Sequence, residues 1–309
     1  MTNTSQLPQL PFDRWKETRM TLHLILQIIG KIRLNLTPRK NHWWFITQYV
    51  SVHGFTTSQI PCGDGINSFE IVYDVHKSEV RIYTSFSEER TIPLTDGLTI
   101  ADFYQQFMQA LELLNISVNI IGRPFDLGIE KLFSEITEYH HFDQEYIRKF
   151  WKIMLWVDSV FNEFSGRFYG KTCPVQLYWH HMDLAVTRFS GKKAPPLSPS
   201  SRLSDKDAYS HEVISFGFWA GDDMVREPAF YSYTYPSPEG LDKKELRPEP
   251  ARWVDSNGSP TAFLGYHDLI RSDNPRADLL DFLESTYQAG AVLSNWDVEN
   301  FRTLPLNEL

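Results

Sequence analysis

Histidine, aspartate and glutamate side chains gather in two neighbouring stretches, YWHHMDLAVTRFSG at 178–191 and YSHEVISFGFW at 209–219. A metal ion needs three or four such ligands that converge on one point. The residues that would supply them are His180, His181, Asp183 and His211. Glu212 follows His211 on a predicted strand, so the two side chains point to opposite faces and at most one joins the set. These residues do not show the spacing of any known metal-binding motif, so we expect no metal. A metal site formed by these four residues is the alternative hypothesis.

Proton transfer near neutral pH is a second kind of chemistry that these residues offer. The candidate acid/base groups are His211 and Glu212 on the second stretch, and His23 on the first predicted helix. Nucleophilic catalysis has less support, because no Gly-x-Ser-x-Gly turn occurs. Nothing near Cys62 would obviously lower its thiol pKa, and we expect both Cys62 and Cys173 to be bystanders. One hypothesis is therefore an acid/base or metal-dependent enzyme of hydrolase type.

The helix predicted over 13–34 carries a narrow polar stripe. Steps of 100° per residue place His23, Gln27 and Lys31 along one line, and apolar side chains cover most of the remaining circle. A surface helix has a broader polar face, so this helix is predicted to be mostly buried. Its stripe either meets water along a thin line or lines an internal polar cavity.

Further candidate ligand-binding residues lie on predicted strands. On a strand over 183–189, Asp183 and Thr187 share one face, and Arg188 lies on the other face among apolar residues. Such an arginine indicates a charge directed into a cleft or a paired, partly buried guanidinium. Two adjacent tryptophans in NHWW at 41–44 would point to opposite faces of a strand, one into the core and one toward a pocket or interface. The complete ligand-binding set is Gln27, Lys31, His42, Trp43, Asp183, Thr187, Arg188 and Trp219.

Composition excludes several classes of partner. The formal net charge of −9 argues against nucleic acid and against an anionic membrane surface. Two cysteines imply no disulfide framework, and the apolar runs are far shorter than the ~20 residues that span a bilayer. The first residues lack a signal-peptide pattern, so we expect a cytoplasmic protein. No phosphate loop or dinucleotide fingerprint occurs, and any cofactor stays unidentified.

The chain resembles itself when it is shifted by 136 residues. Six positions then match an identical residue: Trp15, Lys16, Gly30, Pro38, Trp43 and Val50. Runs of predicted strands flanked by helices, without strict alternation, favour an α+β fold with antiparallel sheets. We therefore predict two helix–strands–helix repeats over 10–122 and 140–296, with loops 192–201 and 236–258 inserted in the second.

The strands expected in these repeats are short β-branched and aromatic runs. They are 43–52, 55–60, 68–75 and 79–84 in the first repeat, and 175–180, 183–189, 211–219 and 229–235 in the second. Helices are expected over 13–34 and 145–168 from their apolar spacing, and the start signals Thr99 and Asn274-Pro275 predict two more. Residues 180–182 should form a tight turn between two strands.

Four motifs together give the chain a family likeness. NHWW at 41–44, DLAVTRFSG at 183–191, YSHE at 209–212 and GFW at 217–219 resemble a bacterial family described as a domain of unknown function, over about Leu10 to Trp296. The resemblance implies a bacterial protein and carries no catalytic residue, because the family has no established activity. The pair His180-His181 departs from the family pattern, which has small residues there.

Three hypotheses for function follow from these residues. The first is a protein that binds a small molecule in a cleft between the two repeats, packed as one globular unit. Lys31 and Arg188 would favour an anionic ligand. The second is the enzyme described above. The third is a protein-interaction or dimerisation module, in which exposed tryptophans contact a partner or a second copy.

Overall fold

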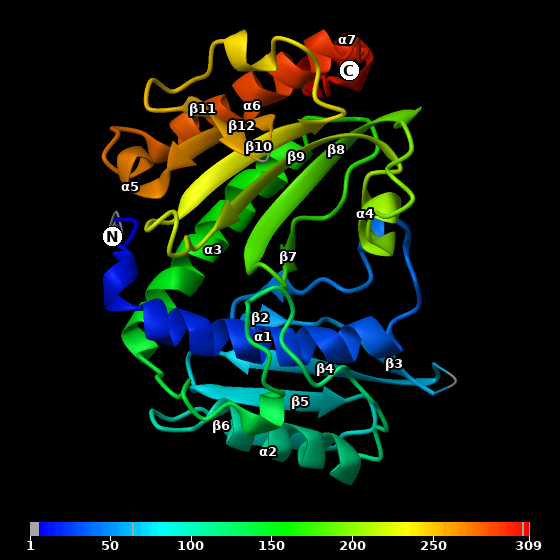
Figure 1. Cartoon of the computed structure of the whole chain (residues 1–309), viewed down its shortest axis with the longest axis vertical. Coiled ribbons are helices and arrows are strands. Elements are labelled where there is room, and N and C mark those ends of the chain that lie inside the picture. The colour runs from blue at the N-terminus through cyan, green and yellow to red at the C-terminus, as the bar shows by residue number, and fades with distance from the viewer. Residues whose placement is uncertain (1–5, 64, 257, 305, 309) are drawn as a thin grey trace. The chain divides into compact units, whose positions relative to one another are not determined.

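The described part of the chain folds as an α+β protein (Figure 1), in which the strands form two antiparallel sheets of six strands each. This computed structural model of the 309-residue chain describes residues 6–63, 65–256, 258–304 and 306–308. The fold class predicted from runs of strands flanked by helices is confirmed.

The described residues divide into two compact units. Unit 1 contains the residues up to Lys40, Trp44–Leu155 and Leu177–Asp183, and unit 2 contains Asn41–Trp43, Trp156–Gln176 and the residues from Leu184 onward. Each unit is described by itself below. The internal duplication stays a prediction.

Unit 1 contains one sheet, two whole helices and the first part of a third helix, α3 (Gln144–Ser165). Its elements are α1 (Lys16–Leu36), β1 (Tyr49–Val50), β2 (Gly54–Thr56), β3 (Ile60–Cys62), β4 (Asn67–Asp74), β5 (Glu79–Thr84), β6 (Glu89–Pro93) and α2 (Ile100–Leu113). The sheet order is β1-β2-β4-β5-β6, and β3 pairs with β4. Ile71 lies opposite Ile82, and Tyr73 lies opposite Val80. All four side chains are fully buried, so these cross-strand pairs form the core face of the sheet.

Both whole helices of unit 1 follow the sequence signals. Apolar residues cover most of α1, and all residues from Thr21 to Arg33 are buried. The α2 helix begins where predicted, since the Thr99 side chain accepts a hydrogen bond from the backbone N–H of Asp102. Helix α1 packs against α2 and β3.

Unit 2 contains most of the second sheet. The elements are the last part of α3 (Gln144–Ser165), β8 (Asp183–Lys193), α4 (Leu203–Ala208), β9 (His211–Trp219), β10 (Ala229–Tyr235), β11 (Arg252–Ser256), β12 (Ser259–Gly265), α5 (Tyr266–Leu269), α6 (Pro275–Leu293) and α7 (Val298–Phe301). The edge strand β7 (Gln176–Tyr178) belongs to unit 1 from Leu177 onward. The sheet order is β11-β12-β10-β9-β8-β7.

Two helices cover one face of the unit 2 sheet. From α3, Phe164 contacts Phe216 of β9 with ring centroids 4.8 Å apart, and Phe161 contacts Phe230 of β10 at 6.5 Å. Helix α6 packs against β9 and β10. It begins at the predicted signal, with Asn274 as N-cap before Pro275. The alternate residues of β9 therefore divide into a helix-covered face and an opposite face.

The prediction of a strand over 43–52 was wrong over most of that range. His42 and Trp43 have φ values of 55° and 62°, in the left-handed region that a strand excludes. The first strand starts at Tyr49, after a single antiparallel bridge between Gln48 and Leu177, so Trp43 and Trp44 do not sit on opposite faces of one strand. The predicted insertion 236–258 contains β11, which forms a hairpin with β12.

Candidate functional site

The polar stripe of α1 lies inside unit 1. His23 is 2% exposed, Gln27 is 0% and Lys31 is 4%. The stripe therefore does not meet water along a thin line. It contacts the turn that joins β7 to β8 and the loop around Phe125, two segments that are distant in the sequence.

Backbone carbonyl groups satisfy the first two residues of the stripe. His23 Nε2 lies 3.1 Å from the carbonyl oxygens of both Trp179 and His180, so this nitrogen carries the proton and donates. The Gln27 amide donates to the carbonyl of Phe125 at 2.9 Å and accepts from its N–H at 2.7 Å. The other ring nitrogen of His23 is buried and has no hydrogen-bond partner among the described residues. These two side chains attach the turn and the loop to the helix.

Burial keeps the histidines of this region neutral. Desolvation, with the charge of Arg19 as a smaller cause, lowers the pKa of His23 to about 3. Desolvation, followed by the charges of His181 and His23, lowers the pKa of His180 to about 3 as well. A general base works best with a pKa near the operating pH, so His23 is poorly suited to that role near pH 7.

Lys31 differs from its neighbours on the stripe, because no described residue forms a hydrogen bond or an ion pair with its ammonium group. Its Nζ lies 5.9 Å from the ring centroid of Trp179 and 6.0 Å from that of Phe133. Among the described residues, no carboxylate oxygen lies within 4.0 Å of this ammonium group. Desolvation lowers the Lys31 pKa. The indole of Trp179 lies against α1 at Gly30 and donates a hydrogen bond to the carbonyl of Ile46 at 2.9 Å.

A second polar cluster lies in unit 2 around His42. This ring donates from Nδ1 to the carbonyl of Asp207 at 3.1 Å, and its Nε2 accepts from Lys171 Nζ at 2.7 Å. The His42 ring also contacts Phe189 at 4.6 Å and His211 at 5.6 Å between centroids. Desolvation and then the charge of Lys171 lower the His42 pKa. Desolvation also lowers the Lys171 pKa, and the nearby Asp207 partly offsets this effect.

His211 and Glu212 point to opposite sides of β9, as the strand period predicts. The His211 ring faces His42, and its Nδ1 lies 3.1 Å from the Ser210 hydroxyl. The Glu212 carboxylate accepts hydrogen bonds from the Ser190 hydroxyl at 2.8 Å and from the Trp296 indole at 3.1 Å. The strand separates the two side chains, so they form no acid/base pair with each other.

Arg188 lies on the helix-covered face of β8 and is 1% exposed. It donates to the carbonyl of Phe164 at 2.6 Å, near the C-terminal end of α3. Its guanidinium carbon lies 3.6 Å from the Phe164 ring centroid and 4.4 Å from that of Tyr287. Desolvation lowers the Arg188 pKa to about 10, so the group stays charged near neutral pH. The negative end of the helix dipole and the aromatic faces stabilise this charge within the core.

The predicted site residues are divided between the two units. Unit 1 holds His23, Gln27, Lys31, His180, His181 and Asp183, and unit 2 holds His42, Trp43, Thr187, Arg188, His211, Glu212 and Trp219.

The remaining predicted residues have ordinary neighbours. Thr187 lies 3.0 Å from the Ser215 hydroxyl, and the Trp219 ring contacts Tyr231 and Phe263. The exposed His181 lies 3.6 Å from an Asp126 oxygen. In the described ranges, no three His, Cys, Asp or Glu side chains come together as metal ligands.

Sequence reasoning missed two residues that complete these clusters. Lys171 stands 129 residues from its partner His42 in the chain, and neither residue type nor spacing connects them. Phe133 lies in a weakly patterned stretch that gave no signal for a contact with Lys31. The six identical positions that suggested two repeats included Gly30 and Trp43, but they did not indicate that Trp179 packs on Gly30.

A family model matches residues 7–303. The chain belongs to the family of unknown function DUF5996. This confirms the resemblance to a domain of unknown function, and the family brings no established activity. No curated protein and no solved structure matches the chain. None of the helices in the described ranges is long and apolar enough to cross a membrane.

Proposed function

We propose that unit 1 binds a small anionic molecule, and that the ammonium group of Lys31 is its charged contact. The supporting observation is a lysine that is 4% exposed and has no carboxylate within 4.0 Å among the described residues. Desolvation lowers the pKa of this lysine, and no charge of a described residue offsets that effect.

An isolated buried charge is costly unless it is paired. Even after relaxation, removing an ammonium group from water costs several kcal/mol. The rings of Trp179 and Phe133 offset only part of this desolvation cost, because a cation near an aromatic ring gains roughly 0.5–2 kcal/mol. A carboxylate or phosphate oxygen would supply the missing charge-assisted hydrogen bond.

The surroundings of Lys31 favour a compact ligand. Two aromatic rings provide apolar walls, and the neighbouring Gln27 already uses its amide on the Phe125 backbone. The ligand would therefore be recognised by one anionic group and by contact with flat apolar surfaces. A ligand-binding cleft between the two predicted repeats stays a separate prediction.

Thermal unfolding in the presence of inorganic phosphate or acetate, at matched ionic strength, tests this proposal. A ligand that binds the folded state stabilises it by about 2.7 kcal/mol at one hundred times its Kd, so the melting temperature should rise with anion concentration. Lys31→Met should abolish the rise, and Lys31→Arg should retain part of it.

Lys77→Met is the matched control, because Lys77 is an exposed lysine in the β4–β5 turn of the same unit. It should respond to the anion like the native chain. If Lys31→Met and Lys77→Met respond equally, the anion does not bind at Lys31 and the proposal fails.

A further inference from the structure

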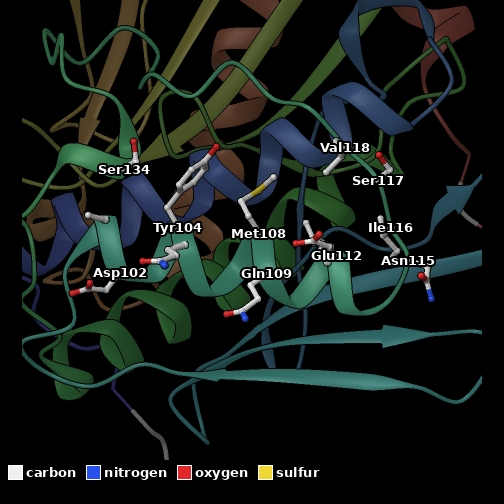
Figure 2. A pocket seen from close by; sticks show the side chains of 13 residues that line it. Asp102, Tyr104, Met108, Gln109, Glu112, Asn115, Ile116, Ser117, Val118 and Ser134 are labelled. Carbon is white, nitrogen blue, oxygen red and sulfur yellow. The ribbon is translucent and has the colours of Figure 1, made fainter.

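A groove runs along α2 in unit 1, apart from the Lys31 site. Figure 2 shows its lining residues, with the stretch Asn115–Val118 toward one end of the helix and Ser134 toward the other. The hollow has a volume of about 940 Å³ and is open to solvent. Its length follows the helix, which suits a segment of polypeptide.

Apolar and aromatic side chains make up part of the groove lining, beside amide and hydroxyl side chains, and we call this part its floor. Tyr104 and Met108 project from α2 on the same side in Figure 2, and Val118 lies beyond them. Leu111 and Ile116 also line the groove and are themselves 1% and 7% exposed. Methionine and tyrosine are adaptable contact residues, typical of surfaces that bind peptides.

The charge of the groove has one sign. Asp102 and Glu112 line it, and no lysine, arginine or histidine is among its lining residues. They stand ten residues apart on α2, which corresponds to about 15 Å along the helix. The Asp102 carboxylate accepts a hydrogen bond from the Thr99 hydroxyl, and the Glu112 side chain makes no hydrogen bond or ion pair with any described residue.

Open backbone groups lie at one end of the groove. Residues 117–121 follow α2 without belonging to a helix or strand, and within the described chain their N–H and C=O groups make no intramolecular hydrogen bond. The exposed side chain of Ile121 continues this segment at 71% exposure. Unpaired backbone groups of this kind are a template for an extended chain.

We propose that the α2 groove binds an extended, lysine- or arginine-containing segment of a partner protein. The apolar floor takes an apolar side chain at Tyr104 and Met108, and the carboxylates of Asp102 and Glu112 take basic side chains on either side of it. An extended chain rises about 3.3 Å per residue, so basic residues four positions apart span about 13 Å and reach both carboxylates. The backbone of Ser117 and Val118 adds hydrogen bonds at the end of the groove.

Fluorescence anisotropy of a labelled peptide against the full chain tests this assignment. The probe carries the core Lys-Ser-Val-Ser-Lys between Gly-Ser flanks, and Glu-Ser-Val-Ser-Glu is the matched control peptide. The lysine peptide should bind and the glutamate peptide should not. Binding should weaken at about 0.5 M salt, because the carboxylates are exposed.

Two variants locate the binding. Glu112→Lys reverses an exposed charge without breaking a described contact and should weaken binding at least about tenfold. Met108→Lys places a cation on the floor and should abolish binding, with circular dichroism confirming that the variant is folded. Arg90→Glu, on the exposed β6 of the same unit, should leave the affinity unchanged.

Three outcomes would overturn the proposal. One is equal affinity for the two peptides, and another is unchanged binding by Glu112→Lys. The third is a dimer, seen by light scattering of the native chain and lost in Met108→Lys, that excludes the peptide from the groove. That last result would assign the groove to a second copy of this chain.

Discussion

Replacing Gly30 by alanine should destabilise the protein, although alanine is the better helix former. A Cβ at this position would lie 2.2 Å from Cδ1 and 2.3 Å from Cγ of the Trp179 indole. Ordinary contacts begin near 3.4 Å, so the indole has to move by about 1 Å from a site where it is 3% exposed.

The magnitude follows from three opposing contributions. Alanine gains up to about 1 kcal/mol over glycine within a helix. Overpacking a filled core costs about 1–3 kcal/mol. If the moving indole loses its hydrogen bond to the Ile46 carbonyl, a buried polar pair is left unsatisfied at a further cost of about 1–3 kcal/mol. We expect a net loss of about 2–4 kcal/mol.

Urea unfolding followed by circular dichroism and tryptophan fluorescence measures this change. Gly122→Ala is the control, because the nearest atom to an added Cβ there is Tyr104 Oη at 3.8 Å. It should change the free energy of unfolding by less than about 0.5 kcal/mol. If Gly30→Ala is instead more stable by about 1 kcal/mol, helix propensity alone decides the outcome and Trp179 does not pack on α1 at this point.

Three further predictions concern the buried polar groups. The pKa of His23 is about 3 in the folded protein and about 6.5 in the unfolded chain, so between these pH values the unfolded chain binds more protons. The free energy of unfolding should therefore fall as the pH drops from 6.5 to 3, by up to about 1.4 kcal/mol per pH unit. His23→Gln, whose amide can donate to the same carbonyls, should flatten this dependence in urea midpoints. A dependence as steep as that of the native chain would contradict the assignment. Arg188→Lys should destabilise by about 2–3 kcal/mol, because an ammonium group cannot stack flat on Phe164, and Arg188→Met should cost less because it removes the buried charge. The opposite order in thermal melts would show that the guanidinium stacking is unimportant. Glu212→Ala should cost about 1–3 kcal/mol by leaving the Trp296 indole N–H unpaired, whereas Glu212→Gln, which keeps an acceptor, should cost about 1 kcal/mol or less. Equal urea midpoints for the two variants would contradict this role of the carboxylate.

Local patterns in the sequence determined most of the secondary structure. The alternation of residues placed β5, β9 and β10 at their observed bounds, and the capping residues Thr99 and Asn274 marked the starts of α2 and α6. The same period of two predicted that His211 and Glu212 face opposite ways. These features depend on near neighbours along the chain, so composition and spacing suffice to predict them.

The turn at 41–43 was missed because its cause is not local. The left-handed backbone of His42 and Trp43 is costly for such residues, and the His42 ring is held by Asp207 and Lys171, both more than 120 residues away. A sequence window around NHWW contains none of these contacts, and its aromatic residues favour a strand.

The sequence by itself determined the fold class, the buried character of α1 and the line of His23, Gln27 and Lys31 along it. Only the tertiary structure decided what each of these residues meets. It places backbone carbonyls of Trp179 and His180 against His23 but only aromatic rings near Lys31. The physical reason is that helix periodicity fixes the direction of a side chain, whereas the polarity of its environment depends on segments some 150 residues away that approach only when the chain is folded.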